Sequence, residues 1–384
     1  MKISLATNFD NQLIEEIKKY PVYEVYGKMN WDIIGGGRAS NSLINFDKKK
    51  FEDHVKKVRD NGINFNYLLN GSCLQNLEQS KEFQNELKIF LKYLKDVGVN
   101  ALTITNPYIL EFVKKYFDDF IVRISTFACV DNFAKAKYWE DLGADIICVD
   151  FVKINRDFKM LKYMVNNLKK AKIEILVTNS CLKDCPYIYT HTTSLSHASQ
   201  KNGSQDYEDW CLHRCQSTEL NNLEEYIKSP WVRPEDICEY EKIGIEHFKI
   251  TERGFPTEEL VKRLKAYCDR TYNGNLLDLI QGHGWGCSEK KVYNRIEELN
   301  SPDEILEEIK KIRGLGCKRE YNRHIYIDNS KFKNFIDFFT QGKCHGYCKE
   351  CNYCKKVSQE VISVDEEVVD YLKQLYQKFE SLKM

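Results

Sequence analysis

Two compact groups of cysteines are the residues of this sequence best suited to chemistry. The first group comprises Cys181, Cys185, Cys211 and Cys215, and the second comprises Cys344, Cys348, Cys351 and Cys354. Four thiolates suit zinc or an iron–sulfur cluster, because both are held by soft sulfur ligands. We therefore expect all eight cysteines to bind metal, and the spacing of the first group is compatible with either kind of site.

Histidines accompany the first group. His191, His197 and His213 lie within or beside the segment that carries these cysteines. An imidazole could replace a thiolate as a ligand, but it could equally donate a hydrogen bond to a ligand or lie in a solvated loop. The sequence leaves these alternatives open.

The second group, "CHGYCKECNYC", has gaps of three, two and two residues. Such a run can hold a 4Fe-4S cluster or a structural zinc. Cys344, Cys348 and Cys351 also match the triad of radical S-adenosylmethionine enzymes, but those enzymes carry the triad after the first strand of their barrel. The ferredoxin run continues to a fourth Cys followed by Pro, which is absent here.

Composition limits the class of protein. The odd count of fifteen cysteines in 384 residues disfavours a secreted disulfide scaffold. No apolar run is long enough to cross a bilayer, and no cleavable leader is evident, so we expect a cytoplasmic protein. The net charge of zero gives no indication of a nucleic-acid partner. Cys129 and Cys148 lie in apolar runs and are expected to be buried, whereas the remaining cysteines could be either structural or functional; they are Cys73, Cys238, Cys268, Cys287 and Cys317.

The elements that must position these groups follow a βα pattern. Eight β-rich runs alternate with amphipathic helical stretches; they are "ISLAT" from Ile3, "VYEVYG" from Val22, "NFNYLL" from Asn64, "ALTIT" from Ala101, "FIVRIS" from Phe120, "DIICVD" from Asp145, "IEILVT" from Ile173 and "IEHFKI" from Ile245. Eight βα units predict an α/β fold, a TIM-type (β/α)8 barrel. A doubly wound sheet would need a phosphate-binding turn, and "GGGR" at Gly35 lacks the spacing of one.

The predicted organisation places the cysteines around this barrel. The barrel spans 1–272, a cysteine-rich insertion after the seventh strand spans 179–231, and a cysteine-rich C-terminal extension spans 273–384. Barrel enzymes build their sites from the loops at the carboxyl ends of the strands. Because the insertion shows no apolar periodicity, we expect a long loop that hangs over the mouth of the barrel. Polar residues gather at most strand ends; they are Asn70, Asn106, Asp150, Asn179 and Arg253.

The stretches "NSCLKDCPYIYTH" and "WVRPEDICEYEKIGIEHFKITERG" resemble peptidase family U32, often labelled collagenase-like proteases. In the better-known branches of that family, cysteines of this region hold a 4Fe-4S cluster, and the activity is hydroxylation of a quinone precursor or an RNA base without molecular oxygen. The resemblance implies that the first cysteine group holds the cluster. The spacing departs from those branches at Cys211 and Cys215, so Cys238 is the reserve ligand.

The resemblance also implies catalytic roles at the end of the eighth strand. "KITERG" would contribute Lys249, Glu252 and Arg253, and His191 joins them as a catalytic candidate. An arginine could clamp a carboxylate of a substrate or oxygen donor. The alternative for these charges is an ion-paired rim of the barrel.

The function that these expectations favour is an iron–sulfur-dependent, oxygen-independent modifying enzyme, most plausibly a hydroxylase of a small molecule or nucleobase. It would carry one 4Fe-4S cluster, with a second cluster or a zinc at the C-terminal group, and would need a small-molecule substrate and an electron donor or second subunit; no membrane partner is expected. A peptidase is one alternative, although "HExxH" and "GxSxG" are absent and only a nucleophile such as Cys73 with a nearby histidine is conceivable. A noncatalytic zinc- or cluster-stabilised binding protein is the other.

Overall fold

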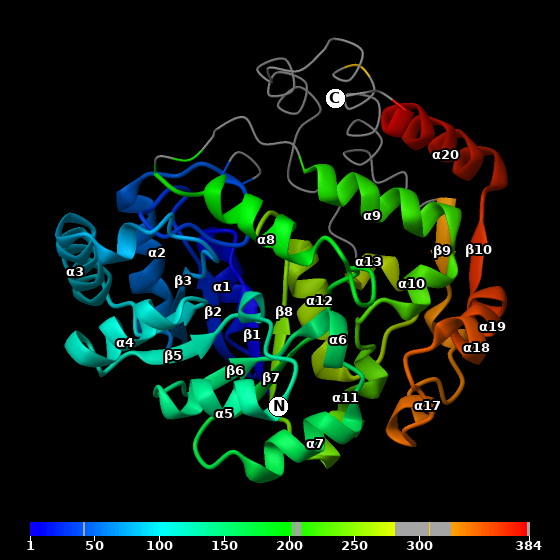
Figure 1. Ribbon diagram of the computed structural model, residues 1–384, viewed down its shortest axis with the longest axis horizontal. Coiled ribbons are helices and arrows are strands. Elements are labelled where there is room, and N and C mark those ends of the chain that lie inside the picture. The colour runs from blue at the N-terminus through cyan, green and yellow to red at the C-terminus, as the bar shows by residue number, and fades with distance from the viewer. Residues whose placement is uncertain (41–42, 202, 204–208, 281–306, 308–323, 382–384) are drawn as a thin grey trace.

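The computed structural model describes residues 1–40, 43–201, 203, 209–280, 307 and 324–381. Eight parallel strands form a closed barrel in which each strand pairs with the next and β8 pairs with β1 (Figure 1). The strands are β1 (Lys2–Ala6), β2 (Val22–Gly27), β3 (Asn64–Leu69), β4 (Ala101–Ile104), β5 (Ile121–Ile124), β6 (Ile146–Cys148), β7 (Lys172–Leu176) and β8 (His247–Ile250). Each predicted run overlaps one strand, so the predicted TIM-type barrel is confirmed.

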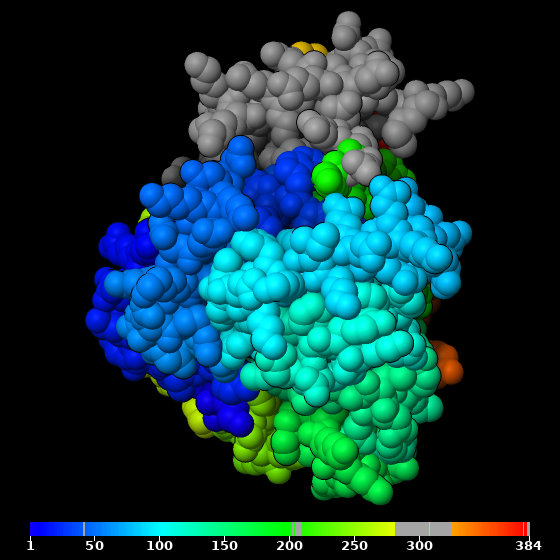
Figure 2. All heavy atoms as spheres, turned by 90° about the vertical axis from the view of Figure 1, so that its left-hand side faces the viewer, coloured from blue at the N-terminus to red at the C-terminus, as the bar shows by residue number. Residues whose placement is uncertain are grey.

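Helices surround the barrel. They are α1 (Asn11–Ile17), α2 (Lys48–Asp60), α3 (Lys81–Asp96), α4 (Pro107–Tyr116), α5 (Phe133–Asp141), α6 (Phe151–Ile154), α7 (Phe158–Asn167), α11 (Ile237–Lys242) and α12 (Thr257–Asp269). Side chains of Asp47, Ser80 and Asn106 accept hydrogen bonds from the first backbone N–H groups of α2, α3 and α4, which fixes where these helices begin. Figure 2 shows residues of the N-terminal half covering one side of the molecule, with the orange C-terminal extension visible only at an edge. Among the helices described, none has both the length and the apolar character needed to span a membrane.

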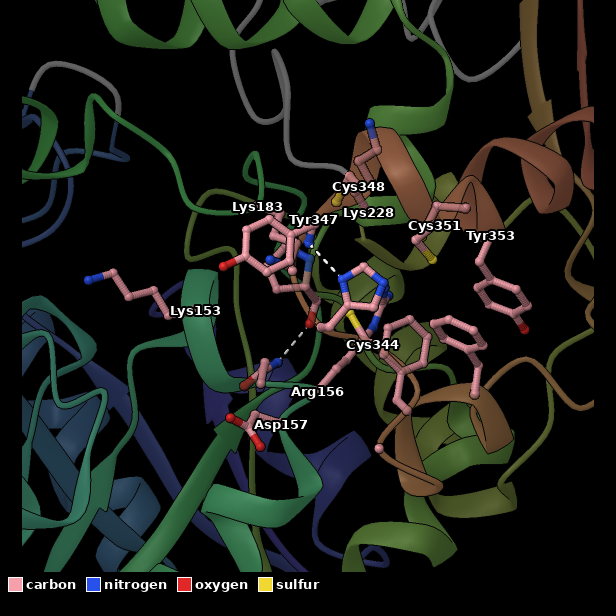
Figure 3. A pocket seen from close by; sticks show the side chains of 18 of the residues that line it. Lys153, Arg156, Asp157, Lys183, Lys228, Cys344, Tyr347, Cys348, Cys351 and Tyr353 are labelled. Atoms are coloured by element: carbon pink, nitrogen blue, oxygen red, sulfur yellow. Dashed lines mark hydrogen bonds between the residues drawn. The ribbon is translucent and has the colours of Figure 1, made fainter.

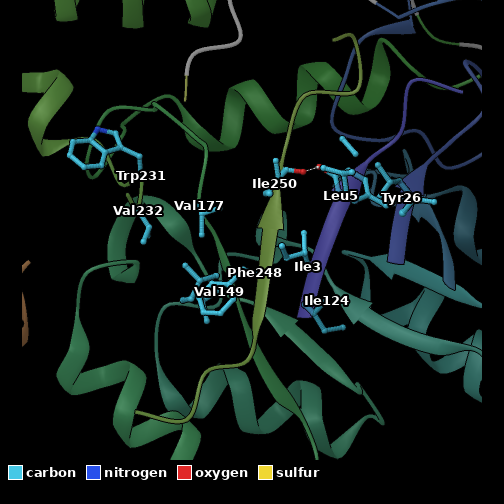
Figure 4. Close-up of a cluster of buried hydrophobic side chains, with 14 of the residues drawn as sticks. Ile3, Leu5, Tyr26, Ile124, Val149, Val177, Trp231, Val232, Phe248 and Ile250 are labelled. Atoms are coloured by element: carbon cyan, nitrogen blue, oxygen red, sulfur yellow. Dashed lines mark hydrogen bonds between the residues drawn. The ribbon is translucent and has the colours of Figure 1, made fainter. Parts of the chain in front are cut away.

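The inside of the barrel contains buried charged residues. Arg123 on β5 donates to Glu24 on β2 at 2.7 Å and to Glu174 on β7 at 2.5 Å. Because β5 is adjacent to neither strand, these bonds cross the interior. Outward-facing residues are apolar: Ile3 and Leu5 flank inward Ser4, and Figure 4 shows both within the hydrophobic core that joins the barrel to its helices.

The insertion after β7 is helical, which corrects the prediction of a long loop. It contains α8 (Ile188–His197), α9 (Trp210–Asn221) and α10 (Glu224–Lys228). Apolar periodicity is missing from the sequence because these helices bury polar residues. On α8, the Ser196 hydroxyl donates to the carbonyl of Thr192 at 2.7 Å. On α9, Gln216 and Glu219 are among the buried residues.

The C-terminal extension packs on the same core. Its elements are α13 (Leu277–Ile280), β9 (Ile325–Ile327), α17 (Asp337–Thr340), α18 (Cys348–Cys351), α19 (Tyr353–Val361), β10 (Ile362–Val364) and α20 (Glu366–Ser381), and β9 pairs antiparallel with β10. The Trp231 ring lies 5.5 Å from the rings of both Phe332 and Phe335. Extension and barrel therefore share one hydrophobic core. Cys287 and Cys317 lie outside the described residues.

Helix α20 holds α9 against the molecule. The Tyr376 hydroxyl donates to Gln216 Oε1 at 2.5 Å, and Arg214 pairs with Glu380 at 2.9 Å. The last helix of the chain is thus fastened to the helix that carries Cys211 and Cys215.

Candidate functional site

The first cysteine group lies over the carboxyl ends of β6 and β7. Cys181 and Cys185 follow β7, while Cys211 and Cys215 lie one turn apart on one face of α9. Cys185 and Cys215 pack into a small apolar cluster with Cys148, at the end of β6. The structure therefore brings thiols from two separate segments to the barrel mouth; their role as metal ligands stays a prediction.

The four thiols of the first group differ in pKa. The Cys215 thiol donates a hydrogen bond to Cys185, which lowers the pKa of Cys185 to about 7 and raises the pKa of Cys215 above its usual range. Burial raises the pKa of Cys211 to about 11 and also raises that of Cys181. Cys185 is thus the first thiol of the group to become a thiolate, the form that binds metals.

The described residues contain no set of three His, Cys, Asp or Glu side chains arranged around a single metal ion. The thiols are nevertheless neighbours. Charges on Cys181 and Cys185 both act on Cys215, and a charge on Cys185 acts on Cys211. The thiols of this group are therefore close enough for their charges to interact.

Glu219 is a buried acid beside these thiols that sequence reasoning missed. It lies one turn after Cys215 on α9 and is 1% exposed. Burial raises the pKa of the Glu219 carboxyl well above its usual range, and within the described residues its Oε1 has no hydrogen-bond partner. The four-residue spacing of Cys211, Cys215 and Glu219 is the signal that would have revealed it, once a helix was assumed.

The "KITERG" residues form the end of β8 and the turn that follows it. Lys249 is buried, with its ammonium 4.2 Å from the centre of the Tyr26 ring. Glu252 forms an ion pair with Arg38 and has a φ of 93°, in the left-handed region that non-glycine residues rarely adopt. The alternative of an ion-paired rim therefore holds for Glu252.

Arg253 differs from Glu252 because part of its guanidinium makes no hydrogen bond within the described residues. It is 7% exposed, and Nη1 has no hydrogen-bond partner in the part of the chain that the structure describes. Burial lowers the pKa of Arg253 to about 10, and the neighbouring charge of Arg38 adds to this effect. Arg38 is also close enough to Cys181 for their charges to interact. Arg38 thus links Arg253 to the first cysteine group, because its charge acts on both Arg253 and Cys181.

The glycines of "GGGR" place Arg38. Gly35 has a φ of 79°, and a Cβ there would lie 2.3 Å from the Ser196 carbonyl oxygen on α8. Asp32 accepts hydrogen bonds from the backbone N–H of Ile34 at 2.9 Å and of Gly35 at 2.6 Å. These glycines therefore allow close packing of the β2 loop on α8, a role that the sequence analysis did not assign.

Polar residues at the strand ends divide into two kinds. Asn106 caps α4, and Asn179 accepts a hydrogen bond from the Cys181 N–H at 2.8 Å. In contrast, Asn70 Oδ1 and Asp150 Oδ2 are buried and lack a hydrogen-bond partner among the described residues. Burial raises the pKa of Asp150. Such orphaned atoms need a partner such as a ligand or water.

The three histidines have different surroundings. His191 Nε2 lies 3.0 Å from Asp209 Oδ2, and the ring is close enough to Cys185 to influence its charge. His213 is 1% exposed on α9, with its ring 6.2 Å from that of Tyr376. His197 is the last residue of α8. Of the three, His191 is the one whose charge acts on a thiol of the group.

Two other cysteines lie elsewhere. Cys238 is on α11, where its thiol contacts the Glu235 carbonyl at 3.5 Å and Glu239 at 3.6 Å, so the structure does not bring this reserve ligand to the group. Cys73 follows β3, and no hydrogen bond joins its thiol to a histidine within the described residues. Cys129 and Cys148 are buried, as predicted.

The second cysteine group lies in the C-terminal extension. Cys344 follows α17, Cys348 and Cys351 are the ends of α18, and Cys354 is in α19. All four line one pocket, which Figure 3 shows between the extension and the barrel.

Comparisons with known proteins identify the family of this chain. The model of peptidase family U32 matches residues 35–275, well over half of the chain. The uncharacterized protease MJ1657 of Methanocaldococcus jannaschii is 26% identical over 367 residues, covering 94% of this chain and 96% of that protein. A solved structure, that of the U32 peptidase Mk0906, is 20% identical, covers 65% of this chain and 92% of its own, and has a TM-score of 0.48. The chain belongs to peptidase family U32.

Proposed function

We propose that this protein is an iron–sulfur-dependent enzyme that modifies a small anionic molecule or a nucleobase without molecular oxygen, most plausibly by hydroxylation. One observation carries the proposal: thiols from two separate segments meet over the barrel mouth, where the charge of Arg38 acts on Cys181. Barrel enzymes place their chemistry at this face.

The donor set supports an iron–sulfur cluster. Cys181, Cys185, Cys211 and Cys215 supply four soft ligands, the number that such a cluster uses. Four thiolates also suit a structural zinc, so metal analysis of the purified protein decides between the two. When bound, the cluster would supply one-electron redox chemistry or an open coordination position.

The substrate would bind at the polar strand ends. Arg253 offers an unused, buried Nη1, and a guanidinium binds a carboxylate or phosphate through paired hydrogen bonds. Asn70 Oδ1 and Asp150 Oδ2 offer acceptors on the same face of the barrel. Arg38, held by Glu252, extends the positive charge towards Cys181.

Two side chains would donate or accept protons at this site. Glu219 holds a proton on its buried carboxyl beside Cys215. His191, oriented by Asp209, lies near Cys185. Both can donate hydrogen bonds towards the thiolates, which tunes a bound cluster.

Peptide hydrolysis is the activity in the family name and in the name of the relative, but the site does not favour it. The sequence lacks "HExxH" and "GxSxG". A cysteine nucleophile needs a neighbouring base, and Cys73 has no histidine bonded to its thiol within the described residues.

The test is anaerobic purification followed by measurement of iron, acid-labile sulfide, zinc and visible absorption. We expect the double variant Cys181→Ser/Cys185→Ser to lose about four irons per chain relative to wild type. Cys238→Ser is the matched control and should keep all of its iron, because Cys238 lies on α11. Full iron content in the double variant would refute the ligand assignment.

Activity is tested on the same preparations. Wild-type protein should not cleave gelatin or quenched fluorescent peptides, with or without iron. Hydrolysis that persists in Cys181→Ser/Cys185→Ser and disappears in Cys73→Ser would replace the proposed function with a cysteine peptidase.

A further inference from the structure

The second cysteine group faces a cavity of about 380 Å³ between the barrel and the C-terminal extension (Figure 3). Its walls come from α6 and the start of α7, from α10, and from α17 to α19. All four thiols line it although they come from a loop and two helices. The cavity therefore gathers four soft ligands around open space.

The thiols of the second group share one cavity and are less deeply buried than most of those of the first group. All four are half-buried, whereas Cys185, Cys211 and Cys215 of the first group are buried. The second group is thus the more accessible of the two.

Positive charge lines the same cavity. Arg156 donates to the carbonyls of Trp231 at 2.7 Å and Ile227 at 2.8 Å, and its guanidinium lies 4.3 Å from the centre of the Trp231 ring. Within the described residues no carboxylate forms an ion pair with Arg156, while its charge acts on Cys354. Lys183 and Lys228 act in the same way on Cys348, but Lys183 pairs with Asp184 and Lys228 pairs with Glu224 and Glu225. Arg156 is therefore the cation that favours an anionic occupant of this cavity, such as a cluster bound by four thiolates.

The two cysteine groups are close together. Lys183 lies between Cys181 and Cys185 in the sequence, yet it lines the cavity of the second group. Phe151 and Val152 pack against the first group and also line that cavity. The same side chains therefore contact the first group and line the cavity of the second.

We propose that Cys344, Cys348, Cys351 and Cys354 hold a second 4Fe-4S cluster, which relays single electrons between a one-electron donor and the cluster of the first group. In each step a donor such as a reduced flavin or iron–sulfur protein would lose one electron and the second cluster would gain it; the first cluster would then take this electron, and the second would return to its oxidised state. No bond forms or breaks. The relay rests on the proposed function, whereas binding of the second cluster does not.

The full chain, purified without oxygen, tests this inference. Wild type should contain about eight irons with matching sulfide, and Cys344→Ser/Cys348→Ser and Cys181→Ser/Cys185→Ser should each keep about four. Cys268→Ser on α12 is the control and should keep all eight. After reduction with dithionite, the electron paramagnetic resonance spectrum of wild type should show magnetic interaction between two reduced clusters, which either double variant abolishes.

Lys183→Gln provides a milder variant, because it leaves every cysteine in place. Loss of a cation beside the second cluster should shift the midpoint potential of that cluster to a more negative value, while Lys95→Gln on α3 should leave it unchanged. An unchanged potential in Lys183→Gln would contradict the placement of the cluster in this cavity.

The outcomes separate the two proposals. Full iron content in Cys344→Ser/Cys348→Ser would overturn the second cluster. One zinc per wild-type chain that is lost in this variant would overturn it as well. Iron bound only by the second group overturns the proposed function and the relay but supports the second cluster. Two clusters without magnetic interaction overturn the relay.

Discussion

Replacing Gly35 by Ala should destabilise the protein more than the same change at Gly62. Both residues are in the left-handed region, with φ of 79° and 74°, so an alanine pays a similar backbone cost of about 1–2 kcal/mol at either position. Their surroundings differ. A Cβ at Gly35 would lie 2.3 Å from the Ser196 carbonyl oxygen, whereas a Cβ at Gly62 has nothing within 4 Å.

The difference between the two variants therefore measures the close approach of the β2 loop to α8. Backbone atoms cannot move aside as a flexible side chain can, and overpacking costs about 1–3 kcal/mol. We expect Gly35→Ala to lose about 1–3 kcal/mol more than Gly62→Ala in the free energy of unfolding.

Urea denaturation followed by circular dichroism measures both variants under the same conditions. Metal-free protein should be used, so that ligand binding does not add to the free energy of unfolding. If the two variants agree to within about 0.5 kcal/mol, the scatter expected for substitutions without a specific mechanism, the close packing that places Arg38 is refuted.

Two further predictions concern the barrel itself. Arg123→Met leaves Glu24 and Glu174 buried without their cation and should lower the free energy of unfolding, measured by urea denaturation, by about 3–5 kcal/mol. The control Lys114→Met breaks the half-exposed pair with Asp145 at 3.2 Å and should lower it by less than about 1 kcal/mol. Similar losses in the two variants would contradict the importance of the buried Arg123 network. Burial lowers the pKa of His54 from 6.5 to about 4, so between these two pH values the histidine takes up a proton when the protein unfolds. The free energy of unfolding should therefore fall by up to about 3 kcal/mol as the pH falls from 6.5 to about 4. His54→Gln should remove this part of the acid sensitivity in denaturation series at pH 7 and pH 4, and an unchanged difference between the two pH values would contradict it.

The barrel could be predicted from the sequence because its strands carry a local signal. The run from Val22 and the run from Asn64 coincide with β2 and β3, since buried parallel strands read as short apolar or β-branched runs between helical stretches. The family could be predicted as well, from the stretches around Cys181 and before β8.

The candidate site was only partly predictable. The cysteines were found by type and spacing, but Glu219 was not, because α9 buries polar residues and so lacks an apolar stripe. Arg38 was missed because its position depends on a contact between Gly35 and Ser196, residues far apart in the sequence. Long-range packing of this kind leaves no periodic signal.

The attachment of α20 to α9 has a consequence for the order in which the protein is made. Synthesis proceeds from the N-terminus and folding follows it, so all eight strands of the barrel are available before α20 leaves the ribosome. Tyr376, which fastens Gln216 of α9, is added 160 residues after its partner. The helix that carries Cys211 and Cys215 therefore reaches its final position only once α20 has been made, so residues made late fix the arrangement of cysteines made much earlier.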